Sequence, residues 1–134
     1  MTIEEISSSL LAWSFLDFHN ERGDNEILEW LNSLPKGAKA KINARISALQ
    51  GFPIFPEQYF SAYKSAPGLF ELRISFAGVQ YRPFGFYGPS RKQFCLLVGG
   101  IEKGKIPKSL LRIADDRRKV VERDHSRAKP HDFS

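Results

Sequence analysis

The sequence changes to a period of two at Leu69, and this change constrains the fold more than any other feature. Apolar side chains alternate with polar ones, as in a strand with one buried face: Phe70, Leu72, Ile74 and Phe76 alternate with Glu71, Arg73 and Ser75. Ala77-Gly78 then predicts a two-residue turn, and residues 79–87 predict a second strand. We therefore expect an antiparallel β-hairpin over residues 69–87.

Two helices are predicted ahead of this hairpin. Residues 10–18 are apolar and aromatic without helical spacing, so they predict a first strand. Asp24 is placed to cap a helix that ends before Pro35, and residues 36–50 predict a second helix that stops at Gly51. The apolar residues of the two helices recur at helical spacing: Ile27, Leu28, Leu31 and Leu34, then Ile42, Ile46 and Leu49.

A third strand over residues 93–99 and a helix that begins near Pro107 complete the pattern. The helix is basic, with one mostly apolar stripe: Leu110, Ile113, Ala114, Arg117 and Val121. The order of elements predicts an α+β fold, in which a two-helix hairpin packs on a twisted antiparallel sheet of about four strands and a basic C-terminal helix follows. One face of that sheet is expected to stay open.

The length of 134 residues suits one domain, with a core over residues 10–121 and a loose tail over 125–134. Hydrophobic residues make up 42% of the chain, so a packed core needs no metal or disulfide. The single cysteine, Cys95, suits a reducing compartment, and neither a signal peptide nor a membrane span is evident. We expect a cytoplasmic protein whose oligomeric state the sequence leaves open.

Charge is divided unevenly along the chain. The first 35 residues carry one arginine and seven acids, a net charge of −6, whereas the remainder carries 19 bases and eight acids, a net charge of +11. Such a basic body indicates a polyanionic partner, most often a nucleic acid. The alternative is a basic soluble protein without such a partner.

The predicted hairpin register places two arginines opposite each other. Counting outward from the turn pairs Arg73 with Arg82, and facing like charges destabilise a sheet unless an anion lies between them. Guanidinium groups bind phosphate bidentately, and Phe84 and Phe86 share the face of Arg82, where unpaired bases can stack. In the alternative, the arginines pair with Glu71 or helix acids, and the two phenylalanines pack beneath a helix.

Further basic residues extend this predicted interface. Lys103 and Lys105 lie in a glycine-containing loop that suits phosphate contacts but lacks the Ser or Thr of a nucleotide-binding P-loop. The remaining candidates for RNA binding are Arg91, Lys92, Arg117 and Arg118. No metal site or cofactor is predicted, because the three histidines lack spaced ligand partners and are expected to be solvated: His19, His125 and His131.

Several short motifs resemble a known family. They are Trp30-Leu31 with Leu34, residues 40–51 with Arg45 and Leu49, residues 68–73, residues 81–84, Leu96-Leu97, and the lysine loop followed by Pro107 and a helix with Ala114. Over about residues 10–121 the chain resembles the phage-derived gene-49-like branch of the RelE/HigB toxins of bacterial toxin-antitoxin systems. The resemblance implies a RelE-like fold and metal-independent cleavage of mRNA, often on the ribosome, to inhibit translation.

The resemblance also implies roles for individual residues. Arg73 and Arg82 match the two sheet arginines that orient and neutralise the scissile phosphate, and Lys103 falls near a loop lysine pair. From its position alone, two residues from Arg73 on the same face, Glu71 is a candidate base, with an ordinary ion pair to Arg73 as the alternative. The lysine doublet is interrupted here, and no tyrosine follows Tyr87. These departures leave a second hypothesis, an inactive relative that binds a protein or nucleic acid, as a ParE-like gyrase poison or a host-takeover factor. A toxin would have a cognate antitoxin, expected to be a helix-turn-helix protein.

Overall fold

The computed structural model describes residues 13–52, the backbone of 60–62, and residues 66–134. Within these ranges the elements in chain order are β1 (Ser14–Phe18), α2 (Glu26–Ser33), α3 (Lys36–Leu49), β2 (Phe60–Ala62), β3 (Phe70–Leu72), β4 (Ile74–Phe76), β5 (Val79–Tyr87), β6 (Gln93–Glu102), α4 (Lys108–Arg123), η2 (His125–Arg127) and β7 (Ala128–Pro130). The predicted helices and hairpin are confirmed. The third strand runs three residues further than expected.

The hairpin has the predicted register. Ile74 pairs with Tyr81, and Phe76 pairs with Val79 next to the turn. The two turn residues both have positive φ, 50° at Ala77 and 80° at Gly78, as a two-residue turn between twisted strands requires. β3 pairs with β5 in the same register, so Arg73 stands at the break between the two strands that line one edge of β5.

The sheet is mixed, which corrects the expectation of a purely antiparallel one. The strand order is β2-β3-β5-β6-β1-β7, and β4 pairs with β5 beside β3. β1 runs parallel to β6, and β7 runs antiparallel to β1. Alternation predicts strands but not their direction, and the long connection through α2 and α3 allows β1 to join the sheet in parallel.

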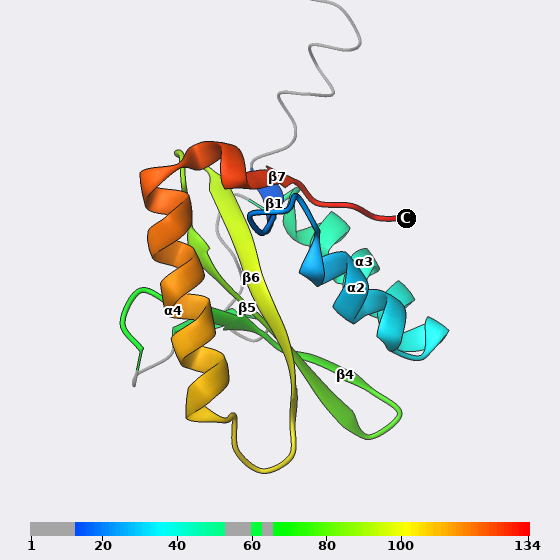
Figure 1. Ribbon diagram of the computed structural model, residues 1–134. Helices are drawn as coiled ribbons and strands as arrows, with labels where there is room; N and C mark the ends of the chain where they lie inside the picture. The colour runs from blue at the N-terminus through cyan, green and yellow to red at the C-terminus, as the bar shows by residue number, and fades with distance from the viewer. Residues whose placement is uncertain (1–12, 53–59, 63–65) are drawn as a thin grey trace, which may run out of the picture.

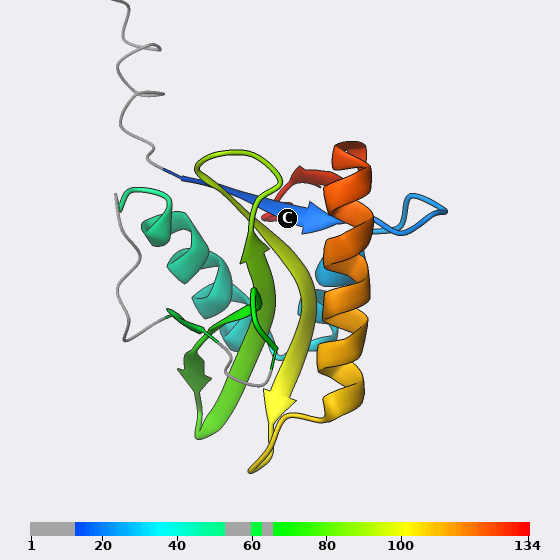
Figure 2. The same ribbon diagram turned by 90° about the vertical axis from the view of Figure 1, so that its left-hand side faces the viewer.

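Helices cover both faces of the sheet (Figures 1 and 2). On one face, α2 and α3 bury a cluster that includes Phe15, Ile42 and Tyr81. On the other, α4 packs Leu111 and Ala114 into a second buried cluster. The expectation of one open face is therefore wrong, because the apolar side of α4 lies over it.

One β-bulge sets which side chains of β6 reach α4. The pairing of β5 with β6 shifts between Phe84 and Gly85, so that Leu97 is an extra residue on β6. Leu97 and Val98 both join the cluster beneath α4, although neighbours on a regular strand face opposite ways. Beyond the bulge, even-numbered residues of β6 face α4, as the contact of Gly100 with Leu110 indicates.

Two helix details differ from the sequence predictions. Asn25, not Asp24, caps α2, since its side chain accepts a hydrogen bond of 3.0 Å from the amide of Leu28. In α4, Leu111 is buried, whereas Ile113 from the predicted stripe is 43% exposed. No helix in the described ranges is long and apolar enough to cross a membrane.

The C-terminal tail is docked, contrary to the prediction that it is loose and that His131 is solvated. β7 pairs with β1, and His131 lies in the interior, where its Nδ1 is 2.6 Å from Oδ1 of Asp17 and its Nε2 is 2.9 Å from Oδ1 of Asn43. Asp17 also accepts hydrogen bonds from the side chain of Asn25 and the amide of Asp132. A buried carboxylate needs such partners, and the tail supplies two of them.

His131→Ala is expected to lower the free energy of unfolding by roughly 3 kcal/mol, because it leaves the buried Asp17 without its histidine. The control is His125→Ala, which truncates an exposed histidine of the same tail and should change stability by less than about 0.5 kcal/mol. Urea denaturation of both variants measures the difference. Equal stability of the two would contradict a structural role for the docked tail.

Candidate functional site

Five polar residues meet where β3, β5 and β6 lie side by side, and we call them the arginine–glutamate cluster: Glu71, Arg73, Gln80, Arg82 and Glu102. Their positions follow from the register. Gln80 pairs with Glu102, and the β3–β5 and β4–β5 pairs on either side place Arg73 opposite Arg82. The expected meeting of the two arginines therefore occurs, with carboxylates beside them.

Arg82 is the centre of the cluster, and its side chain is only 10% exposed. Its Nη2 lies 2.9 Å from Oε2 of Glu102 and donates to Oε1 of Gln80 at 3.3 Å. Its Nε lies 3.9 Å from Oε2 of Glu71 and has no hydrogen-bond acceptor among the described residues. One donor of this guanidinium is thus buried without a hydrogen bond and faces only the carboxylate of Glu71.

Glu71 links the two arginines. One carboxylate oxygen lies 3.4 Å from Nε of Arg73 and the other faces Arg82. Burial raises the pKa of Glu71 above its ordinary value, and this effect outweighs the positive charges of Arg82 and Arg73, which act to lower the pKa. A carboxyl group whose pKa is raised in this way holds and releases a proton nearer to neutral pH.

Arg73 is the accessible member of the cluster, with 43% of its side chain exposed. It stands between β3 and β4, outside the regular ladder, and its one ion pair within the described residues is with Glu71. An anion approaching the sheet therefore meets Arg73 before it meets Arg82. Such a pair of guanidinium groups suits the oxygens of a phosphodiester.

The lysine loop lies at the same end of the sheet. Lys103 and Lys105 follow Glu102, and their backbones form an isolated bridge around Gly104, whose φ is 83°. Both lysines are exposed, and neither makes an ion pair within the ranges that the structure describes. The loop thus begins directly after Glu102, the β6 member of the cluster, and contact of its lysines with RNA stays a prediction.

Other predicted contacts are arranged differently. Phe84 is fully buried and Phe86 is 5% exposed beneath α4, so neither offers a free face for base stacking, and that expectation is wrong. Arg91 and Lys92 are exposed in the turn between β5 and β6, at the end of β5 opposite Gln80. These two residues are therefore not brought to the arginine–glutamate cluster.

The two arginines of α4 that are predicted to bind RNA have intramolecular partners. Arg117 pairs with Glu26 of α2, donates to the carbonyl oxygen of Leu97 at 2.8 Å, and lies over the ring of Phe18. Arg118 pairs with Asp115 of its own helix at 2.6 Å. RNA binding by both residues stays a prediction.

Gln80 and Glu102 are members of the cluster that were not predicted from the sequence. Gln80 follows from the hairpin register, because it lies two residues from Arg82 on the same face. No local sequence pattern places Glu102 beside Arg82, because it faces that side of the sheet only as a result of the bulge in β6. Within the described residues, no group of three or more His, Cys, Asp or Glu side chains is arranged to hold a metal ion.

A comparison with known protein families gives a match. The profile of a family described as "Phage derived protein Gp49-like (DUF891)" matches residues 29–119, about two thirds of the chain. This segment contains all five residues of the arginine–glutamate cluster and both lysines of the loop. A search of curated proteins found no match.

The environment of Glu71 predicts its titration. Its pKa, followed by carbon NMR of the carboxyl group, should lie above the ordinary value of 4.5. Because the folded form then binds the proton more tightly, Glu71 favours folding below pH 4.5, and this contribution is lost as pH rises through the folded pKa. A measured pKa below 4.5 would instead show that the two arginines outweigh burial.

Proposed function

The chain belongs to the phage-derived Gp49-like family, a family of RelE/HigB-like toxins, and we propose that it is the toxin of a type II toxin-antitoxin system that cleaves mRNA. The proposed activity is a metal-independent endoribonuclease that inhibits translation. The observation that carries the proposal is the arginine–glutamate cluster, in which two arginines flank a partly buried carboxylate.

The proposed reaction needs proton transfer and stabilisation of a phosphate. The 2′-hydroxyl loses its proton to Glu71, and its oxygen attacks the adjacent phosphorus while the bond to the 5′-oxygen breaks and that oxygen takes up a proton from water. The products are a 2′,3′-cyclic phosphate and a 5′-hydroxyl. Arg73 and Arg82 stabilise the charge that develops on the phosphate oxygens, and Lys103 or Lys105 contacts the RNA from the loop.

The geometry supports these assignments in two ways. Glu71 lies within ion-pair distance of both arginines, so a phosphate held by Arg73 and Arg82 is next to a proton acceptor. The raised pKa of Glu71 makes it a stronger base than an exposed glutamate. We propose that the substrate is mRNA, on the ribosome or free, that the toxin acts in the cytoplasm, and that a helix-turn-helix antitoxin covers the basic surface.

The contacts of Arg82 favour a second candidate, a binding protein without nuclease activity. Its guanidinium already has Glu102, Gln80 and Glu71 around it, as in a structural ion-pair network. The chain also lacks a tyrosine after Tyr87. An inactive relative would act as a ParE-like gyrase poison or as a host-takeover factor that binds another protein or a nucleic acid.

Arg73→Ala should reduce RNA cleavage by roughly a hundredfold and relieve growth inhibition, because it removes one phosphate-binding guanidinium. Its side chain is partly exposed, so the fold should be retained, and circular dichroism checks this. The control is Arg22→Ala, which removes an arginine that is 81% exposed in the turn before α2. Cleavage is measured by mapping RNA ends after inducible expression and with purified protein.

The same experiment separates the two candidates. New RNA ends that depend on Arg73 support the nuclease. Growth inhibition with intact RNA, or with gyrase-linked DNA breaks, supports the binding protein. Equal cleavage by wild type, Arg73→Ala and Arg82→Lys would contradict the assignment of the site while leaving nuclease activity itself in place.

A further inference from the structure

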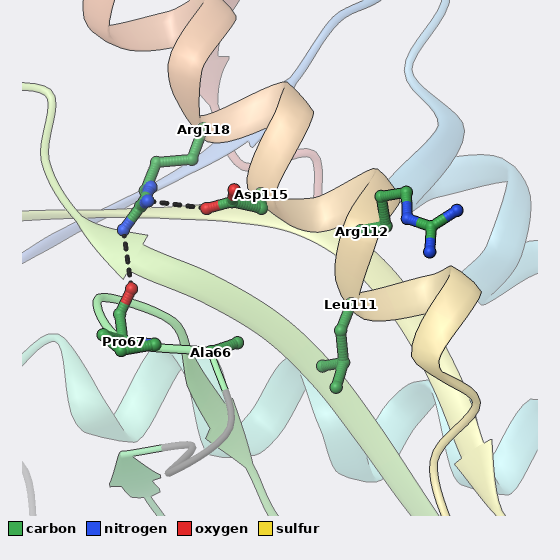
Figure 3. Close-up of a pocket in the computed structure, with 6 residues that line it drawn as sticks. All are labelled: Ala66, Pro67, Leu111, Arg112, Asp115 and Arg118. Carbon is green, nitrogen blue, oxygen red and sulfur yellow. Dashed lines mark hydrogen bonds and ion pairs between the residues drawn. The ribbon is translucent and has the colours of Figure 1, made fainter.

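A pocket of about 310 Å³ lies between α4 and the loop that leads into β3 (Figure 3). Its walls are the aliphatic side chains of Ala66, Pro67 and Leu111, and its polar groups come from α4: Arg112, Asp115 and Arg118. Leu111 belongs to the buried cluster beneath α4 and gives the pocket a firm apolar side. The pocket is separate from the contacts that define the arginine–glutamate cluster.

Arg118 is held in place at the pocket. Its Nη1 donates to the carbonyl oxygen of Pro67 at 3.0 Å, and its Nη2 bonds Oδ1 of Asp115 at 2.6 Å, as Figure 3 shows. Its Nε is buried without a hydrogen bond among the described residues and lies 3.8 Å from Oε1 of Glu122. A fixed planar guanidinium provides a surface on which a nucleobase can stack.

The loop is shaped to admit this arginine. Gly68 has a φ of 89°, a conformation that favours glycine, and a Cβ atom there would overlap Nη1 of Arg118. Any larger residue would therefore displace the guanidinium from the carbonyl oxygen of Pro67. The loop and α4 thus form a preorganised site, in which the backbone of the loop positions the side chain of Arg118 on α4.

We infer that this pocket binds a nucleobase of the RNA, next to the phosphate that the arginine–glutamate cluster holds. The inference rests on the proposed function, because it assigns a second contact to the same substrate. The apolar walls and the guanidinium plane suit the faces of a flat aromatic ring. The carboxylate of Asp115 pairs with Arg118 and, at 3.3 Å, with Lys119, and its remaining lone pairs can accept a hydrogen bond from the polar edge of the ring. Apolar walls with a few placed polar groups are typical of sites for small organic groups.

The pocket and the cluster are close enough for one RNA strand to reach both. Pro67 precedes Glu71 by four residues, which corresponds to at most roughly 13 Å of extended chain. Leu111 packs in the same buried cluster as Phe84, and Phe84 pairs directly with Glu71. A base in the pocket therefore belongs to a nucleotide near the cleaved bond.

Asp115 predicts which bases fit. Its ionised carboxylate accepts hydrogen bonds but donates none, so it favours a base with an exocyclic amino group. Adenine, cytosine and guanine carry such a group, whereas the one donor on the pairing edge of uracil, N3–H, lies between two carbonyl oxygens that a carboxylate repels. The pocket should therefore discriminate against uracil at this position of the RNA.

Binding of the four nucleoside 5′-monophosphates tests the inference without requiring cleavage. Titrations followed by nitrogen–proton NMR should shift the amides of Gly68, Asp115 and Arg118, with UMP binding at least fivefold more weakly than AMP, CMP or GMP. Arg118→Ala should weaken binding about tenfold. Asp115→Asn should remove the discrimination against UMP.

Matched controls separate the base from its phosphate and from general charge. Arg123→Ala removes a cation from the exposed last turn of α4, outside the pocket, and should bind nucleotides as the wild type does. Inorganic phosphate alone should leave the pocket amides unshifted. Shifts confined to Arg73 and Arg82, or equal affinity of wild type and Arg118→Ala, would overturn the inference, whereas loss of RNA cleavage alone would bear only on the proposed function.

Discussion

The antiparallel pairing of β5 with β6 is the interaction on which the rest of the structure depends. It joins both buried clusters, because successive residues of β5 point alternately to α2 and α3 or to α4. After the bulge at Leu97, the side chains of β6 that would have pointed to one face of the sheet point to the other. Without it, Glu102 would point away from Arg82, and Gly100 would not lie beneath Leu110. One extra residue therefore decides the composition of the polar site.

The charges of the arginine–glutamate cluster have two roles: they stabilise the folded sheet, and they take part in the proposed cleavage of RNA. Two arginines opposite each other cost folding energy unless anions separate them, and Glu71 and Glu102 provide those anions in the free protein. A phosphate bound by the proposed nuclease takes over part of that role and leaves Glu71 available to accept a proton. Partial burial strengthens each of these interactions, because little water competes for the charged groups.

Much of the fold can be predicted from the local alternation of apolar and polar residues. The predictions that were wrong share one cause. The hairpin register followed from alternation and a two-residue turn, and it placed Arg73 opposite Arg82 correctly. Long-range packing is not written in local periodicity, so the parallel pairing of β1, the cover of α4 over Phe84 and the docking of His131 were all missed. Glu102 was missed for the same reason, since its direction depends on a bulge that no local pattern indicates.

The most direct test of the central claim is whether RNA binding changes the environment of the guanidinium groups of Arg73 and Arg82. The Nε–H signals of arginine side chains can be followed by NMR while the protein binds an RNA whose 2′-hydroxyls are methylated, which prevents cleavage. The signals of Arg73 and Arg82 are expected to shift together on binding, because both guanidinium groups meet one phosphate. RNA binding that leaves both signals unchanged would contradict the assignment of the arginine–glutamate cluster as the phosphate site.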